Sequence, residues 1–176
     1  MIKQLINPKT GEYRAFKEHV MSNRFTWNWI GSTSPAVPHE DDYPFFGHCF
    51  LKRPMDSKED AYLYPTQTCE LLPNVNYLIG QILAVNDIEI NCLLRVNVNM
   101  TLPQYGPNTL KHTPTHVDHP FPHKNMLIYL NESDGATVAG LDSFDPVEDA
   151  IILFEGEHHH YLPTKGRRLV MIVTYV

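Results

Sequence analysis

Residues 93–100 read Leu-Leu-Arg-Val-Asn-Val-Asn-Met, and this stretch indicates how the second half of the chain folds. From Leu94 onward apolar and polar side chains alternate, which is the period-two pattern of a β-strand with one buried face. Arg95, Asn97 and Asn99 share the other face. These polar side chains could line a pocket or lie on a solvated surface, and both interpretations stay open.

Further segments with the composition of β-strands follow up to the end of the chain. Runs rich in β-branched and aliphatic residues occupy residues 88–100, 126–131, 150–154 and 169–176. No helical pattern separates these runs, so the expected architecture is an antiparallel sandwich or jelly roll. Asp134 and Gly135 lie between two of the runs and predict a hairpin turn, because glycine readily adopts a positive φ.

Helical periodicity is found in the first half of the chain. Between residues 74 and 85 the apolar side chains follow the i, i+3, i+4 spacing, which predicts an amphipathic helix. Residues 13–21 show a similar spacing and predict a short helix. We therefore expect one domain over residues 1–176, with helical support in about residues 1–87 and a metal-binding β core in about residues 88–176.

Length and composition bound the class of protein. A chain of 176 residues and 20.3 kDa suits a single soluble domain. Its net charge of −6 and its lack of a basic tract disfavour a nucleic-acid partner. The apolar runs are too short to span a membrane, and the first residues lack the features of a secretory signal. The expected location is the cytoplasm, or the host cytoplasm if the chain is viral.

Histidine residues are concentrated in two places. Seven of the ten lie in the stretches 112–123 and 158–160. In an extended chain His116 and Asp118 project to the same side, so an imidazole and a carboxylate can share one metal ion. The second stretch directly follows a predicted strand and can supply a third ligand. Two histidines and a carboxylate on one face form the ligand set of non-haem Fe(II) oxygenases.

Each of these motifs also has an ordinary explanation. A His-x-Asp pattern is common on protein surfaces, and three consecutive histidines commonly form a polar hairpin tip. Here both motifs lie at the ends of predicted strands, and Arg167 and Arg168 follow at the start of the last strand. A planar guanidinium suits the bidentate binding of a small dicarboxylate cosubstrate. The combination favours a metal site over separate surface groups.

Taken together, the motifs between residues 93 and 176 resemble those of the Fe(II)- and 2-oxoglutarate-dependent oxygenases, especially the prolyl-hydroxylase-like branch and small phage-encoded members. The resemblance implies a mainly β fold: a double-stranded β-helix of the jelly-roll, cupin-like type, with one or two N-terminal helices packed on it. The motifs are His-Val-Asp at 116–118, Ile-Tyr-Leu-Asn at 128–131, Asp-Gly-Ala-Thr at 134–137, Phe-Glu-Gly with the histidine run at 154–160, and Pro-Thr-Lys-Gly-Arg-Arg at 163–168.

The resemblance also implies roles for individual residues. His116 and Asp118 would bind Fe(II) together with one histidine of the 158–160 run. Tyr129 and Arg168 would bind the distal carboxylate of the cosubstrate 2-oxoglutarate, and of the two adjacent arginines Arg168 fits the family spacing better. The implied reaction uses O₂ to hydroxylate a C–H bond, with release of succinate and CO₂.

The third metal ligand has three candidates. The distance from Phe154 favours His160, whereas the distance to Pro163 favours His159. Strand alternation from Phe154 allows His158 or His160. We assign His160 as the third ligand at this point.

Two other functions fit parts of the pattern. A cupin-like metalloenzyme would use the same barrel and ion without 2-oxoglutarate, and a jelly-roll viral structural or binding protein would carry the histidines as surface groups. In such folds the loops recognise the prime substrate. A protein side chain, a free amino acid or another small metabolite therefore all stay open as the substrate.

Overall fold

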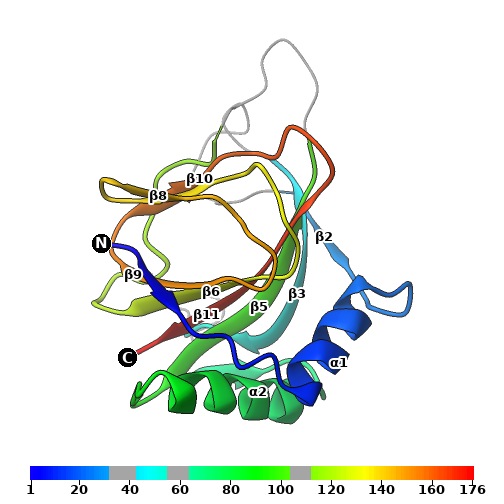
Figure 1. Cartoon of the computed structure of the whole chain (residues 1–176), viewed down its shortest axis with the longest axis vertical. Coiled ribbons are helices and arrows are strands. Elements are labelled where there is room, and N and C mark those ends of the chain that lie inside the picture. The colour runs from blue at the N-terminus through cyan, green and yellow to red at the C-terminus, as the bar shows by residue number, and fades with distance from the viewer. Residues whose placement is uncertain (32–42, 55–63, 104–111) are drawn as a thin grey trace.

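The computed structural model describes residues 1–31, 43–54, 64–103 and 112–176. Their strands form two antiparallel sheets that lie in separate layers, and two helices lie on the outer side of the larger sheet (Figure 1). This arrangement confirms the predicted mainly β, jelly-roll architecture with N-terminal helices packed on it.

The larger sheet brings together strands that are far apart in the sequence. Its order is β1-β9-β6-β11-β5-β3-β2, and β4 also pairs with β3. The long strand β11 therefore lies between β6 and β5 and holds both in register. The strand bounds are β1 Lys3–Leu5, β2 Asn28–Ile30, β3 Phe45–Lys52, β4 Thr66–Gln67, β5 Leu93–Thr101, β6 Lys124–Tyr129, β9 Ile151–Glu155 and β11 Arg168–Tyr175.

The smaller sheet has the order β10-β7-β8. These strands are short: β7 is Thr137–Ala139, β8 is Asp142–Phe144 and β10 is His158–His160. Two isolated bridges, His116 with His158 and His112 with Tyr161, extend this sheet along the other edge of β10. The chain before β6 thus runs beside the histidine run.

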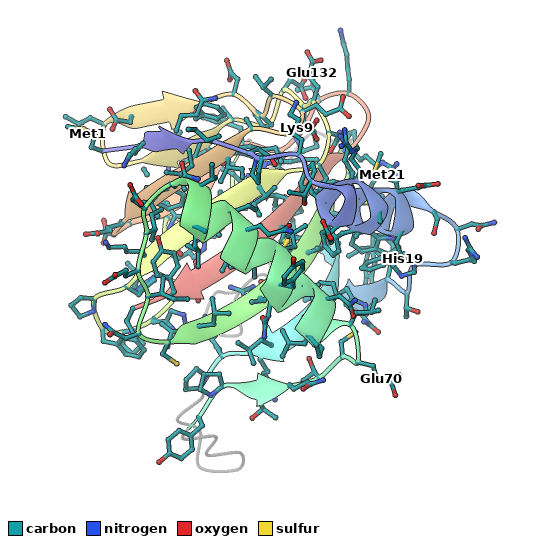
Figure 2. All side chains as sticks on the ribbon, turned by 60° about the horizontal axis from the view of Figure 1, so that its bottom comes forward. Met1, Lys9, His19, Met21, Glu70 and Glu132 are labelled. Atoms are coloured by element: carbon teal, nitrogen blue, oxygen red, sulfur yellow. The ribbon has the colours of Figure 1, made fainter. Side chains whose placement is uncertain are left out.

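Helices α1 (Gly11–Met21) and α2 (Leu72–Val85) both contribute to the core on the outer side of the larger sheet; in Figure 2, α2 lies in front of the sheet and α1 lies to its right. The Thr10 hydroxyl caps α1 by accepting a hydrogen bond from the Tyr13 backbone N–H at 3.3 Å. The apolar face predicted for α2 is buried, through Val75, Leu78, Ile79, Ile82 and Leu83. Neither helix in the described part of the chain is long and apolar enough to cross a membrane.

The two faces of β5 have different environments. Val96 and Val98 belong to the hydrophobic core beneath the helices. Arg95 and Asn99, on the opposite face, line a cavity on the side of the smaller sheet. Asn97 is buried on that face and donates a hydrogen bond to the Asn99 side chain at 2.5 Å. The polar face of residues 93–100 is therefore a pocket wall and not a solvated surface.

The structure also differs from the sequence-based expectations at the start of the β-rich half. The strand expected from residue 88 begins at Leu93. The Ile88 backbone N–H donates to the Leu83 carbonyl at 3.0 Å, so this residue closes the end of α2 instead. In addition, residues before 88, expected to be helical support, contribute β1 to β4 to the larger sheet.

The hairpin predicted at Asp134 and Gly135 is wrong. The flanking strands do not pair with each other: β6 pairs with β9 and β11, whereas β7 pairs with β8 and β10. The segment crosses from one sheet to the other, and Asp134 accepts a hydrogen bond from the Thr164 backbone N–H at 2.9 Å. The tight turn follows β7 instead, where Gly140 has a φ of 60°.

Candidate active site

A cavity of about 490 Å³ lies between the inner face of the larger sheet and the histidine-rich strand β10. Its wall carries charged and titratable side chains from several elements. The apolar floor of the cavity is formed by Leu127, Val170 and Ile172. The polar part of the wall includes His116, Asp118, His158, His160, Arg53, Arg95 and Arg168. A concave site with converging polar groups is the usual form of a small-molecule binding site.

His116 and His158 are held side by side by the backbone, with their rings tilted by 53° to each other. Each donates its backbone N–H to the other's carbonyl at 3.0 Å, and their ring centroids are 4.4 Å apart. The Nδ1 atom of His116 lies 2.9 Å from the Pro114 carbonyl, and that of His158 lies 3.3 Å from the Gly156 carbonyl. Because a carbonyl can only accept, Nδ1 carries a proton in both rings, and Nε2 is the nitrogen that is left to face a metal.

Asp118 is the carboxylate of this cluster. It is buried, and its Oδ2 lies 3.6 Å from Nε2 of His158. Burial alone would raise its pKa, but Arg95 and His158 outweigh that effect and hold the pKa at about 2. Asp118 is therefore ionised at neutral pH. Burial also lowers the pKa of His158 to about 4, so its imidazole is neutral and can act as a metal ligand.

Two arginines contact Asp118. Nη1 of Arg95 donates to its Oδ1 at 2.7 Å, and Nη1 of Arg53 donates to its backbone carbonyl at 2.5 Å. With the carboxylate turned towards Arg95, no three His, Cys, Asp or Glu side chains in the described ranges converge on one point as they stand. Metal binding would require Asp118, now paired with Arg95, and the two imidazoles to move closer together. The donor set of two imidazoles and one carboxylate fits Fe(II) chemically.

The structure separates the three candidates for the third ligand. His158 lies against Asp118 and His116. His159 projects to the other side of β10, where its ring lies 4.8 Å from that of His112. The His160 ring faces the same cavity as His158 but lies further along, 6.5 Å from the Tyr43 ring. The geometry thus favours His158 over His160, the residue that the sequence analysis preferred.

Arg168 and Thr137 line another part of the cavity, and Tyr129, which is fully buried, contacts both of them. Thr137 Oγ1 accepts from the Tyr129 hydroxyl at 2.8 Å and from Arg168 Nη2 at 2.8 Å, while Arg168 Nε donates to the Gly135 carbonyl at 3.0 Å. Arg168 is 2% exposed, so its guanidinium is turned into the protein. Arg167 faces outward, with Nη2 3.6 Å from Met21 Sδ.

The Arg168 guanidinium has no carboxylate partner among the residues that the structure describes, since none lies within 4.0 Å of it. Burial lowers the pKa of Arg168. Arginine side chains nevertheless stay charged in proteins. A buried, unpaired cation is unfavourable unless an anion joins it. This part of the cavity is therefore suited to bind a carboxylate.

Sequence reasoning missed two of these groups. Thr137, which links Tyr129 to Arg168, lies within a quoted motif but was given no role. Arg53, just after β3, had no local signal, because its contact with Asp118 joins residues 65 positions apart. Arg95 was recognised only as a residue that could line a pocket.

Comparison of the sequence with protein-family models gives no match, and comparison with curated proteins gives none either. Solved structures do match. A 2OG-Fe(II) oxygenase family oxidoreductase from Burkholderia pseudomallei has a TM-score of 0.65 and 10% identity, covering 99% of this chain and 84% of that one. A Pseudomonas putida prolyl-4-hydroxylase has a TM-score of 0.54 and 14% identity, covering 99% and 91%.

A third match is the epimerase SnoN, solved in complex with Fe³⁺, alpha ketoglutarate and nogalamycin RO. It has a TM-score of 0.52 and 11% identity, covering 99% of this chain and 78% of that one. At identities this low, the matches show the fold. The chain has the double-stranded β-helix fold of the 2-oxoglutarate and Fe(II) oxygenases.

Proposed function

We propose that this chain is an Fe(II)- and 2-oxoglutarate-dependent dioxygenase that hydroxylates a C–H bond. One observation carries the proposal. A single cavity has the His116, Asp118 and His158 cluster at one place, and at another the buried Arg168, which has no carboxylate partner among the described residues. A metal site beside a carboxylate site is what a chelating keto acid with a second, distal carboxylate requires.

Strand β10 runs from the metal-binding cluster towards Arg168 and so gives the separation of the two sites. His158 contacts the metal-binding cluster, and His160, two residues further along, pairs with Thr137. The hydroxyl of Thr137 in turn contacts Arg168. Two residues on a strand span about 7 Å, a separation that a five-carbon diacid can bridge. The keto-acid end of 2-oxoglutarate would lie near His158 and its distal carboxylate near Arg168.

His116, Asp118 and His158 would hold the iron. When bound, the iron would supply the activation of O₂ that couples oxidative decarboxylation of 2-oxoglutarate to hydroxylation, with succinate and CO₂ as co-products. The chain supplies orientation: the carbonyls of Pro114 and Gly156 fix the tautomers of the two imidazoles. The apolar floor of the cavity would shield the reacting centre from water.

Arg168 and Tyr129 would hold the distal carboxylate of 2-oxoglutarate. The guanidinium is already fixed by Gly135 and Thr137, so little side-chain entropy is lost on binding. A cupin-like enzyme that does not use 2-oxoglutarate has no need of this buried arginine. The cytoplasmic location and the likeness to phage-encoded members stay predictions.

Formation of succinate tests this proposal. Purified protein with Fe(II), ascorbate and 2-oxoglutarate in air should form succinate even without a prime substrate, through uncoupled turnover. Asp118→Ala should form none above the protein-free level, and Arg167→Gln, which changes an outward-facing arginine, should match the wild type. Equal succinate formation by wild type and Asp118→Ala would contradict the proposal.

A further inference from the structure

Arg53 and Arg95 form a pair of cationic side chains on the cavity wall, beside Asp118. They come from different elements, since Arg53 follows β3 and Arg95 lies within β5. Both contact the same aspartate, one through its carbonyl and the other through its carboxylate. Arginine side chains stay protonated in proteins at neutral pH. Two like charges are thus held close together.

Asp118 is the acidic partner of this pair within the described ranges. Arg95 forms one ion pair there, with Asp118, and Arg53 forms none with a carboxylate. If Asp118 binds Fe(II), as the proposed function requires, its negative charge is committed to the metal. Two partly buried guanidinium groups would then face the cavity beside a divalent cation. This arrangement is unfavourable unless a bound anion neutralises the positive charges.

In the proposed function both carboxylates of the cosubstrate already have partners, because the keto-acid end lies at the metal and the distal carboxylate lies at Arg168. Along β5 and β11, Thr101 pairs with Arg168, whereas Arg95 pairs with Thr174. These pairs are six residues apart, about 20 Å along the strands. Arg168 and Arg95 therefore stand at opposite ends of the same strand pair. A 2-oxoglutarate molecule held by Arg168 leaves the arginine pair at the other end free for a second ligand.

We propose that Arg53 and Arg95 together bind an anionic group, a carboxylate or a phosphate, of a small prime substrate. This inference rests on the proposed function and names the substrate class for it. Planar guanidinium groups bind both kinds of anion in bidentate fashion. The apolar side chains of the cavity floor would contact the carbon skeleton of the substrate. A cavity of about 490 Å³ has the size of a small-molecule site.

A different role for the two arginines would be to position Asp118 for the metal. The two roles predict different measurements. A positioning role predicts that loss of Arg53 weakens metal binding, because the carboxylate loses its orientation. A substrate role predicts that metal and 2-oxoglutarate binding persist while the preference for an anion disappears.

The experiment uses three probes with the same six-carbon chain: hexanoate, hexyl phosphate and the neutral hexanamide. Full-length protein is first titrated anaerobically with Mn(II), as a stand-in for Fe(II), and then saturated with 2-oxoglutarate. Each probe is then titrated in by calorimetry. We expect at least one anionic probe to bind the wild type about 10-fold or more tightly than hexanamide, the effect of about one charged hydrogen bond.

The variants are Arg53→Gln, Arg53→Lys and, as a matched loss of one positive charge elsewhere, Arg167→Gln. Arg53→Gln should abolish the preference for the anion while Mn(II) and 2-oxoglutarate affinities stay within about 2-fold, a change of less than 1 kcal/mol. Arg53→Lys should keep part of the preference, because lysine keeps the positive charge but lacks the paired N–H donors of a planar guanidinium. Arg167→Gln should behave as the wild type. Comparison of hexanoate with hexyl phosphate tells a carboxylate from a phosphate.

Failure of this inference can be told from failure of the proposed function. Wild-type protein that binds Mn(II) and 2-oxoglutarate but shows no preference for either anionic probe would overturn the inference alone. The same holds if Arg53→Gln retains the preference, or if it lowers Mn(II) affinity as strongly as anion binding. Wild-type protein that binds neither Mn(II) nor 2-oxoglutarate would overturn the proposed function and this inference with it.

Discussion

Nε2 of His158 lies 3.6 Å from Oδ2 of Asp118, although the two residues are 40 positions apart in the sequence. The contact arises because His116 and His158 form a β-bridge, which places Asp118, two residues beyond His116, beside the start of β10. The proximity of these two proposed metal ligands therefore depends on the register between the segment around His116 and strand β10.

His158→Ala should weaken metal binding more than His160→Ala does. Loss of a residue that only hydrogen-bonds to a metal ligand lowers metal affinity by about 10- to 100-fold. Loss of a direct ligand should lower Mn(II) affinity by at least as much. His160→Ala should stay close to the wild type, since His160 lies further along the cavity. Anaerobic Mn(II) titration of both variants measures this. The opposite order would restore His160 as the third ligand.

Arg168→Gln should weaken 2-oxoglutarate binding by about 10- to 100-fold, because charged hydrogen bonds contribute about 1.5–3 kcal/mol. Binding of Mn(II) itself should be unchanged. Arg167→Gln is the matched control, since the adjacent arginine faces outward. Calorimetric titration of Mn(II)-loaded protein with 2-oxoglutarate distinguishes the two variants. Equal losses in both would show that the inward orientation of Arg168 has no role in binding the cosubstrate.

Gly135→Ala should destabilise the fold by about 1–3 kcal/mol through overpacking. A Cβ at this position would lie 2.7 Å from the Tyr161 carbonyl oxygen and 3.0 Å from Cδ of Arg168. Gly80→Ala is the control: it lies in α2 with open space around it, so alanine should be neutral or stabilise by about 0.5–1 kcal/mol. Urea unfolding of both variants measures the difference, and equal stabilities would refute the close approach at Gly135.

His119 should make the metal-free protein less stable below neutral pH. It is buried with Nε2 2.8 Å from the Thr174 hydroxyl, and burial, followed by the charge of His123, lowers its pKa to about 4. The unfolded chain, with a histidine pKa of about 6.5, binds a proton in a window where the folded chain does not. Stability therefore rises with pH from about 4 to about 6.5 and is level above that range.

His119→Gln removes this titration while keeping a polar partner for Thr174. Between pH 7 and pH 5, the wild type should lose up to about 2 kcal/mol more unfolding free energy than the variant. Urea unfolding at both pH values gives the comparison. If wild type and variant lose the same amount, the pKa of His119 is not lowered by folding.

Local patterns predicted much of this architecture. The alternation from Leu94 to Asn99 predicted β5, and the apolar spacing of residues 74–85 predicted α2, because both depend on side-chain periodicity within one segment. The proximity of His116 and Asp118 likewise follows from their i, i+2 spacing. These features need no knowledge of distant neighbours.

The features that the sequence left open or predicted wrongly depend on distant contacts. His158 and His160 lie on the same face of β10, and the pairing with His116 is what brings His158 to Asp118. Arg53 reaches the site only through tertiary packing of β3 beside β5. At Asp134 and Gly135, local turn chemistry predicted a hairpin, but strand pairing places each flanking strand in a different sheet.

The measurement that tests the account most directly is an anaerobic titration of the Fe(II)-loaded protein with 2-oxoglutarate, followed by visible absorption. The wild type should develop the metal-to-ligand charge-transfer band of a chelated keto acid. Asp118→Ala should show no band, and Arg168→Gln should need about 10-fold or more 2-oxoglutarate to reach it. A folded wild-type protein that binds Fe(II) but gives no band at any 2-oxoglutarate concentration would contradict the proposed function.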